Sequence, residues 1–133
     1  MTSLKPRKHR LVWCHDDWLP YSYAFCPSER AWERAREYGV EGPYPTDDAS
    51  CTHFKNKMHH QFTTFVTVGE HIKSRREIVE YLVHEGTHVW GRMREEMGEQ
   101  SPSSEFSAYT MQAIVGRLIR AYEVTRGPLI GGK

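Results

Sequence analysis

Two histidines four residues apart, with a glutamate directly after the first, stand out in the segment His84-Glu85-Gly86-Thr87-His88. On a helix, residues four apart lie on one face, so both imidazoles can bind one metal ion. Zinc is bound by imidazole and carboxylate groups, and a catalytic zinc site leaves one position to water. Glu85 is rotated by about 100° from the first histidine and can take a proton from that water. The segment therefore predicts two metal ligands and a general base.

Helical patterns surround this segment and follow it. The first runs from about residue 75 to 97, with a capping box formed by Ser74 and Glu77 at its start and Gly98 at its end. Its apolar residues recur at helical spacing: Ile78, Val79, Leu82, Val83, Val89, Trp90, Met93 and Met97. The second pattern runs from about residue 104 to 126 and ends before a Gly-Pro pair. We therefore expect the histidine pair in the middle of a well-capped helix.

A third protein ligand is expected, because two histidines alone hold zinc poorly. Glu95 lies about 10 Å beyond His88 along the same predicted helix, too far to share the ion, and Glu99 lies farther still. Glu105, at the start of the last helix, can approach His88 if the connector 98–104 runs back along the first helix. An acidic residue in the first turn also stabilises the helix dipole, which is the alternative role for Glu105. We predict that Glu105 is the third ligand and that the last helix crosses the first beside His88.

Strand patterns lie upstream of these helices. Residues 51–54 and 61–68 are rich in threonine, valine and phenylalanine and flank a polar turn, which predicts a hairpin. Residues 11–14 form a short apolar run of strand character, and residues 28–38 predict a helix that stops at Gly39. Together these patterns predict an α+β fold, in which a small β-hairpin or sheet packs beside the two long helices.

Length and composition limit the class of protein. The chain of 133 residues has the length of one domain, and we expect a basic, flexible arm at 1–10, the domain at 11–127 and a tail at 128–133. Lysine and arginine (18) balance aspartate and glutamate (17), so no global charge favours nucleic acid or a membrane as partner. Three cysteines without a C-x-x-C pair, and no apolar signal segment, predict a cytoplasmic protein.

With a glutamate on the next helix, the H-E-x-x-H segment resembles the gluzincin group of zinc metallopeptidases. Glu105-Phe106-Ser107-Ala108-Tyr109 is similar to their pattern of a ligand glutamate followed three positions later by a small residue. The run from His84 to Tyr109, with residues 25–32, is also similar to small metallopeptidases encoded by phages and prophages. The resemblance implies a minimal zincin-like architecture and a peptide or protein substrate, in the host cytoplasm if phage-encoded. It further implies one zinc ion on His84, His88 and Glu105, with Glu85 as the catalytic base.

Two further roles are implied by the resemblance. In that group an edge strand before the helix binds the substrate backbone, which implies that residues 62–68 hold the substrate. Many members also place a tyrosine or histidine opposite the base, where it stabilises the oxyanion. Tyr109, one turn from Glu105, is the first candidate here, and His53, on the predicted hairpin, is the second. The simpler alternatives are a core tyrosine and a surface histidine.

Other sites and functions compete with this interpretation. A structural zinc site can be formed from Cys14, His15, Cys26, Cys51 and His53, although none of them has the short spacing typical of such sites. Trp13, Trp18, Trp32 and Trp90 are expected in the core rather than in a stacking platform, since no basic residues are interleaved with them. The main alternative to a peptidase is a non-catalytic, metal-containing binding module, an interaction or regulatory protein that captures a partner on its edge strand. A weaker alternative is a DNA-associated regulator that uses the basic run Lys5 to Arg10.

Overall fold

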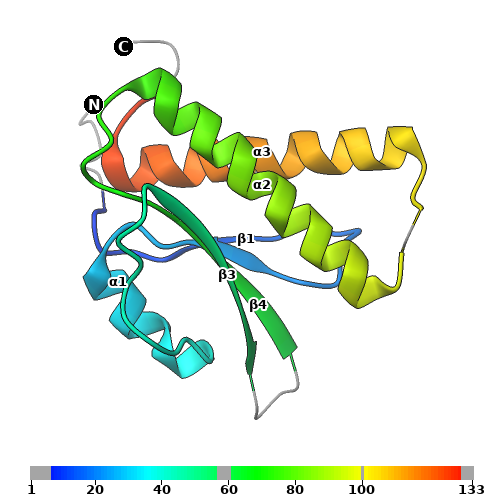
Figure 1. The fold of residues 1–133 in the computed structure, drawn as a ribbon, viewed down its shortest axis with the longest axis horizontal. Helices are drawn as coiled ribbons and strands as arrows, with labels where there is room; N and C mark the ends of the chain where they lie inside the picture. Colours follow the sequence, from blue (N-terminus) through cyan, green and yellow to red (C-terminus); the bar gives the residue numbers. More distant parts are fainter. Residues whose placement is uncertain (1–6, 57–60, 100, 130–133) are drawn as a thin grey trace, which may run out of the picture.

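The computed structural model describes residues 7–56, 61–99 and 101–129, in which helices pack against a small sheet (Figure 1). In chain order the elements are β1 (Val12–Cys14), β2 (Tyr23–Phe25), α1 (Glu29–Arg34), the 3-10 helix η1 (Ala35–Tyr38), β3 (Ala49–Asn56), β4 (Gln61–Val68), α2 (Arg75–Met97) and α3 (Ser104–Arg126). The sheet has the strand order β1-β2-β4-β3. β2 and β4 are parallel, and the other two pairs are antiparallel. The chain thus has the small α+β fold that the sequence predicts.

The predicted hairpin is formed by β3 and β4, which pair along their whole length. β4 also pairs with β2, at Thr64 to Val66, and is therefore an interior strand. The edges of the sheet are β1 and β3. The sequence does not predict β2, because a strand of three buried residues is too short to show alternation.

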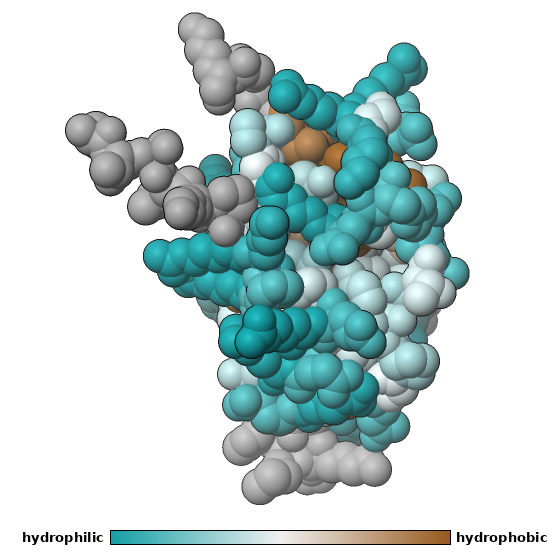
Figure 2. Space-filling view, turned by 90° about the vertical axis from the view of Figure 1, so that its left-hand side faces the viewer, coloured by the Kyte–Doolittle hydropathy of each residue, from teal (hydrophilic) through white to brown (hydrophobic). Residues whose placement is uncertain are grey.

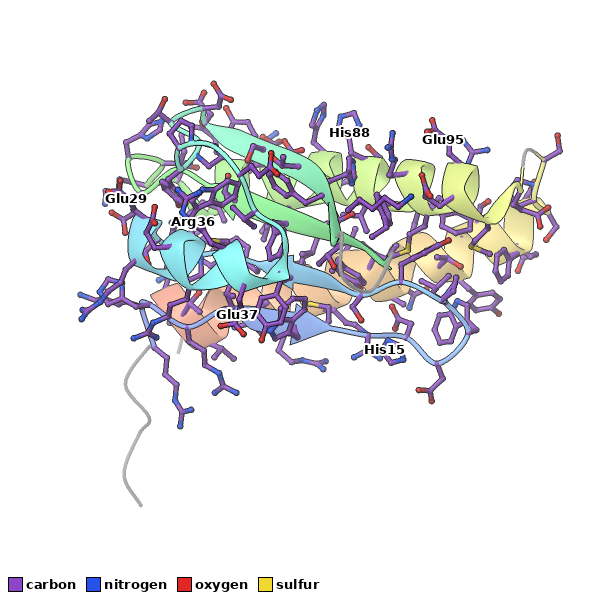
Figure 3. All side chains as sticks on the ribbon, turned by 90° about the horizontal axis from the view of Figure 1, so that it is seen from below. His15, Glu29, Arg36, Glu37, His88 and Glu95 are labelled. Atoms are coloured by element: carbon purple, nitrogen blue, oxygen red, sulfur yellow. The ribbon has the colours of Figure 1, made fainter. Side chains whose placement is uncertain are left out.

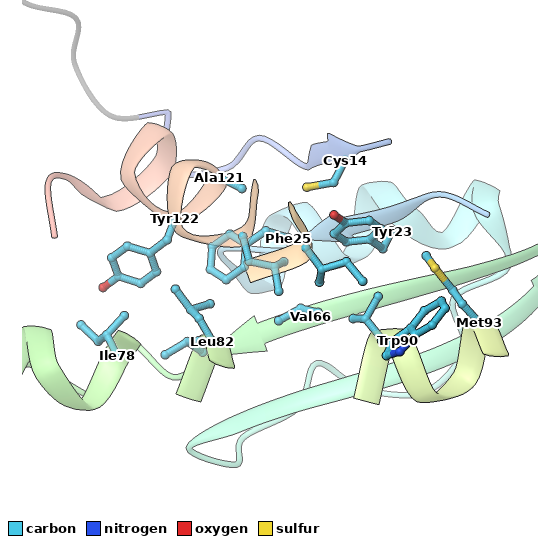
Figure 4. Close-up of a cluster of buried hydrophobic side chains, with 14 of the residues drawn as sticks. Cys14, Tyr23, Phe25, Val66, Ile78, Leu82, Trp90, Met93, Ala121 and Tyr122 are labelled. Carbon is cyan, nitrogen blue, oxygen red and sulfur yellow. The ribbon is translucent and has the colours of Figure 1, made fainter. Parts of the chain in front are cut away.

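Alternate residues of the strands face two different cores, as the period of a strand requires. Phe25 and Val66 pack with the apolar sides of α2 and α3 on one face of the sheet (Figure 4). Ala24 and Phe65, each the neighbour in sequence, pack with Trp32 of α1 on the other face. The sheet is therefore the middle layer, between α1 and the pair of long helices.

The two long helices have the predicted bounds. Ser74 caps α2 by accepting a hydrogen bond from the N–H of Glu77 at 3.3 Å, and Gly98 ends the helix in the left-handed region, with φ of 73°. Ser103 caps α3 by accepting from the N–H of Phe106 at 3.1 Å. These local signals fix where the helices start and stop, whereas their relative position depends on packing.

α3 approaches α2 at Gly86, inside the H-E-x-x-H segment. A Cβ added at Gly86 would lie 3.2 Å from Cγ2 of Val115, 3.6 Å from Ile114 and 3.7 Å from Leu118. The contact with Val115 is closer than most Cβ atoms show, and the other two are ordinary van der Waals contacts. The glycine therefore allows the middle of α3 to pack directly against the backbone of α2.

The predicted helix at 28–38 consists of two pieces. Ser28 caps α1 by accepting from the N–H of Ala31 at 3.2 Å. After Arg34 the helix tightens into η1, which ends at Gly39 with φ of 104°. The predicted start and end are confirmed, and the last turn is a 3-10 helix rather than an α-helix.

The described part of the N-terminal arm is held against the fold. The N–H of Arg7 donates to the carbonyl of Val124 at 2.9 Å. Nδ1 of His9 lies 2.8 Å from Oγ of Ser28, and Arg34 donates to the carbonyl of His9 at 3.2 Å. Residues 7–10 are therefore anchored where the sequence predicts a flexible arm. Residues 1–6 of that arm and 130–133 of the tail lie outside the described residues.

The surface is largely polar on the side that carries α1 and the start of α2. Figure 2 looks onto this side, where hydrophilic side chains cover most of the area and hydrophobic ones gather near the top. None of the helices in the described part of the chain has the length and the hydropathy needed to cross a membrane.

Candidate metal centre

His84 and His88 lie one turn apart on α2, with their side chains exposed and their Nε2 atoms 3.3 Å apart. Two nitrogens that each lie about 2.0–2.1 Å from one tetrahedral ion are themselves about 3.3 Å apart. The same separation suits a weak hydrogen bond between a protonated and an unprotonated ring nitrogen. The spacing of the two imidazoles thus fits two ligands of one zinc ion without rearrangement.

Glu85 lies beside the histidines and is buried, with 6% of its surface exposed. Its carboxylate and the ring nitrogens of His84 and His88 lie within 4.8 Å of one another. Burial raises the pKa of Glu85, the two imidazoles lower it, and Asp47 raises it, so the net shift is upward. A carboxylate with a raised pKa is a better proton acceptor, as a general base requires.

The other wall of the site is the edge strand β3, which contacts α2. Cys51 lies close enough to Glu85 for the carboxylate to raise the pKa of the thiol, in addition to the larger effect of burial. Two residues along the strand, His53 has its pKa lowered to about 4 by burial and by the nearby Arg92 and His88. β3 therefore runs past the H-E-x-x-H segment with Cys51 towards the base and His53 towards the second imidazole.

His53 is fixed in its position by its neighbours on the sheet. Its Nδ1 lies 2.7 Å from Oγ1 of Thr64, a buried residue of β4. Its ring stacks on Phe62 at a centroid distance of 5.5 Å. The ring is thus oriented, and its lowered pKa keeps it neutral at physiological pH.

A depression of about 510 Å³ adjoins the histidine pair at the start of β3. It is lined by Asp47, Asp48, Ala49, Glu77, Glu80, Tyr81, His84 and Glu85. Asp48 accepts hydrogen bonds from Tyr81 at 3.0 Å and, on its other oxygen, lies 2.7 Å from Nε2 of His71. Nothing in the local sequence around the two aspartates indicates that this segment returns to α2.

Glu105 does not join the group of ligand atoms formed by His84, Glu85 and His88 in the described part of the chain. The last helix does pass beside this segment, but it does so with Ile114 and Val115. Phe106, next to Glu105, packs its ring on Trp90 at 5.6 Å. Gly86 and Trp90 are each about 200° around the helix from the preceding histidine, so α3 occupies the side of α2 opposite to the imidazoles. The structure therefore does not bring the expected third ligand to the site.

The structure also separates Tyr109 from the histidine pair. Its side chain is 66% exposed and lines another depression, together with Trp18 and Arg117. Neither the expected oxyanion role nor the alternative of a core tyrosine fits this position. His53, the second candidate, lies near His88 and is the better supported of the two.

The strand expected to bind substrate is not an edge strand. Residues 62–68 belong to β4, whose backbone pairs with β3 along its length and with β2 in its middle. The free edge beside α2 belongs to β3 instead. The sequence predicts the hairpin but cannot tell which of its strands is covered, because β2 comes from a distant segment.

The rival structural zinc site is not assembled. Among the described residues, the group of three or more metal-binding side chains is His84, Glu85 and His88, and it includes none of Cys14, His15, Cys26, Cys51 and His53. All three cysteines are free. In Figure 3, His15 lies on the side of the fold opposite to His88 of the candidate metal centre.

The tryptophans divide into two classes. Trp32 and Trp90 are buried, with 1% and 6% exposed, as the sequence predicts. Trp13 and Trp18 are 41% and 49% exposed, so the prediction of a core position is wrong for both. An aromatic ring in a short loop or edge strand gives no periodicity from which its exposure can be predicted.

Comparisons of the chain with models of protein families, with curated proteins and with solved structures found no match.

Proposed function

We propose that this protein is a zinc-dependent metallopeptidase. The observation that carries the proposal is the pair of Nε2 atoms at 3.3 Å on His84 and His88, with the buried carboxylate of Glu85 within 4.8 Å of them. Zinc, when bound, supplies an acidified water and polarises a carbonyl group. The chain supplies the two imidazole ligands and the base.

Glu85 takes a proton from the attacking water and passes it to the leaving amine. Burial favours this role, because it raises the pKa of the carboxylate towards the pH at which the proton must be shared. His53 stabilises the negative charge that develops on the carbonyl oxygen. The hydroxyl of Thr64 lies 2.7 Å from Nδ1 and can donate to it, which puts the proton of His53 on Nε2. Nε2 lies 3.9 Å from Sγ of Cys51, a weak contact that the oxyanion replaces.

The substrate is a peptide or protein segment in an extended conformation. An extended backbone can add to the free edge of β3, which passes Glu85 at Cys51 and His88 at His53. We also propose that the protein acts in the cytoplasm, because its three cysteines are free and a reducing compartment keeps thiols reduced.

The proposal is tested with purified, zinc-loaded protein and a library of peptides. Glu85→Gln is expected to keep the zinc and to lower turnover by at least about a hundredfold, the range of a general base. Glu33→Gln is the control, because this exposed glutamate lies on α1, on the other face of the sheet, and pairs with Arg36 at the surface. A Glu85→Gln protein that cleaves as fast as the wild type would contradict the mechanism.

A specific observation favours a second function, a metal-containing binding module. Glu105 does not join the histidines, so the described residues offer fewer protein ligands than a catalytic zinc centre usually has. In a module, the remaining positions are filled by a partner that pairs with β3. Zinc-dependent capture of a peptide that is recovered uncleaved, and is captured equally by Glu85→Gln, favours the module over the peptidase.

A further inference from the structure

Two adjoining depressions run along α3 on the side of β1. The larger, of about 400 Å³, is lined by Asp16, Trp18, Tyr109, Gln112, Ala113, Gly116, Arg117 and Arg120. The smaller, of about 120 Å³, lies between β1 and the end of α3 and includes Trp13 and Val124. Arg117 and Arg120 line both. The two depressions therefore form one continuous surface, which we call the β1–α3 face.

Two aromatic rings stand exposed on the β1–α3 face. Trp18 and Tyr109 are 49% and 66% exposed, and both line the larger depression. The ring of Trp18 is held in place, because its N–H donates to Oγ1 of Thr110 at 3.3 Å. Rings that are fixed and exposed lose little entropy when another flat ring stacks on them.

The solvent-exposed charge of the β1–α3 face is positive. Asp16 is the single acidic residue that lines it, and it is fully buried. Its carboxylate accepts from Nε of Arg117 at 2.5 Å, and the side chain of Arg117 remains 41% exposed. The bond to Asp16 fixes the guanidinium and leaves other N–H donors of Arg117 directed to solvent. Arg120, one turn away, is exposed.

The positive surface continues beyond the end of α3. The N–H of Arg7 donates to the carbonyl of Val124, which lines the smaller depression. Arg7 is exposed, so it adds a cation beside the end of α3, whereas Lys8 lines a different depression, together with Glu70 and Arg75. From Tyr109 to Arg120 the face is about 16 Å long at the rise of an α-helix, which exceeds the size of one nucleotide.

We propose that the β1–α3 face binds single-stranded nucleic acid. Unpaired bases stack on Trp18 and Tyr109, while Arg117, Arg120 and Arg7 contact the phosphates. Alternating aromatic rings and cations are the arrangement that binds single strands without reading their sequence. In a duplex the bases are stacked on one another, so no base is available to stack on the exposed aromatic rings. The face lies apart from the metal centre and does not depend on the peptidase proposal.

The test is the fluorescence anisotropy of a labelled oligothymidylate of about 12 nucleotides, titrated with the full chain at low and at moderate salt. Tyr109→Ala is expected to weaken binding by about fivefold or more, the effect of one lost stacking contact, whereas Tyr109→Phe keeps the affinity. Arg120→Ala should weaken binding and reduce the salt slope by about 0.7. Both side chains are exposed, so neither substitution is expected to disturb folding.

Two controls separate this site from general electrostatics and from the metal centre. Arg76→Ala removes one exposed cation from α2, outside the β1–α3 face, and Glu85→Gln alters the proposed base. Both should bind the oligonucleotide like the wild type. The proposal is overturned if the wild type does not bind the oligonucleotide. It is also overturned if a duplex of equal length binds as tightly, or if Arg76→Ala weakens binding as much as Arg120→Ala.

Discussion

The imidazoles of His84 and His88 point away from α3, the helix that packs against the same segment of α2. α3 contacts α2 at Gly86, about 200° around the helix from His84. Glu105, near the start of α3, accordingly does not join the two imidazoles in the described part of the chain. The last helix supports the position of α2, and the space in front of the histidines is bounded by β3 instead.

Metal content distinguishes the two histidines from Glu105. We expect His88→Ala to lose bound zinc, because one imidazole cannot hold the ion, and Glu105→Ala to keep as much zinc as the wild type. The measurement is the zinc content of dialysed protein, together with the rise in Tm on adding zinc. Loss of zinc from Glu105→Ala would contradict the observed packing and return Glu105 to the ligand set.

Two glycines of α2 provide a matched pair for testing the packing of the long helices. Gly86→Leu should lower the free energy of unfolding by about 1–3 kcal/mol or more, because the new side chain meets Val115 and Ile114. Gly91 has no atom within 4 Å of an added Cβ, so Gly91→Leu should leave stability equal or raise it by up to about 1 kcal/mol. Urea denaturation of both variants is the measurement. Equal stability of the two would show that α3 does not pack closely at Gly86.

The ion pair between Asp16 and Arg117 joins the segment after β1 to α3. Asp16 is fully buried and also accepts from the hydroxyl of Tyr23 at 3.2 Å. Arg117→Met leaves this carboxylate without its cation, and we expect the free energy of unfolding to fall by about 3–5 kcal/mol. The double variant Asp16→Asn with Arg117→Met should recover part of the loss, as chemical denaturation can show. If Arg117→Met is as stable as the wild type, the ion pair does not stabilise the fold.

His53 makes the stability of the metal-free protein depend on pH. Its pKa is about 4 in the folded chain, against an ordinary value of 6.5, so the unfolded chain binds a proton more readily. Stability is therefore complete above about pH 6.5 and falls as the pH is lowered towards 4. Since the ring is half-buried and solvent screens it, we expect a loss on the order of 1–2 kcal/mol.

The measurement is thermal unfolding in a chelating buffer across this pH range. His53→Gln should lose this part of the dependence and keep the rest, since a glutamine does not titrate. A His53→Gln protein with the same pH profile as the wild type would assign the effect to other groups.

Local signals in the sequence predict the bounds of the two long helices and place the H-E-x-x-H segment on one of them. Ser74, Gly98 and Ser103 are local caps, and they set the bounds of α2 and α3 where the sequence predicts them. The i, i+4 spacing of His84 and His88 suffices to bring their Nε2 atoms to 3.3 Å, since a helix alone imposes it. Such features depend on neighbours within a few residues, and they can be predicted without knowing the rest of the fold.

The tertiary structure decided which residues surround the histidines. The contact at Gly86 depends on α3, which packs on the side of α2 opposite to the imidazoles, and Glu105 does not join them among the described residues. The pairing of β2 with β4 makes β3 the free edge, and so brings His53 rather than Tyr109 towards His88. In the same way, Arg117 bonds to Asp16, 101 residues away in the sequence. This contact brings a cation close to Trp18, which has no basic neighbour in the sequence. Contacts of this kind arise from the burial of apolar surfaces between distant segments, which no local pattern records.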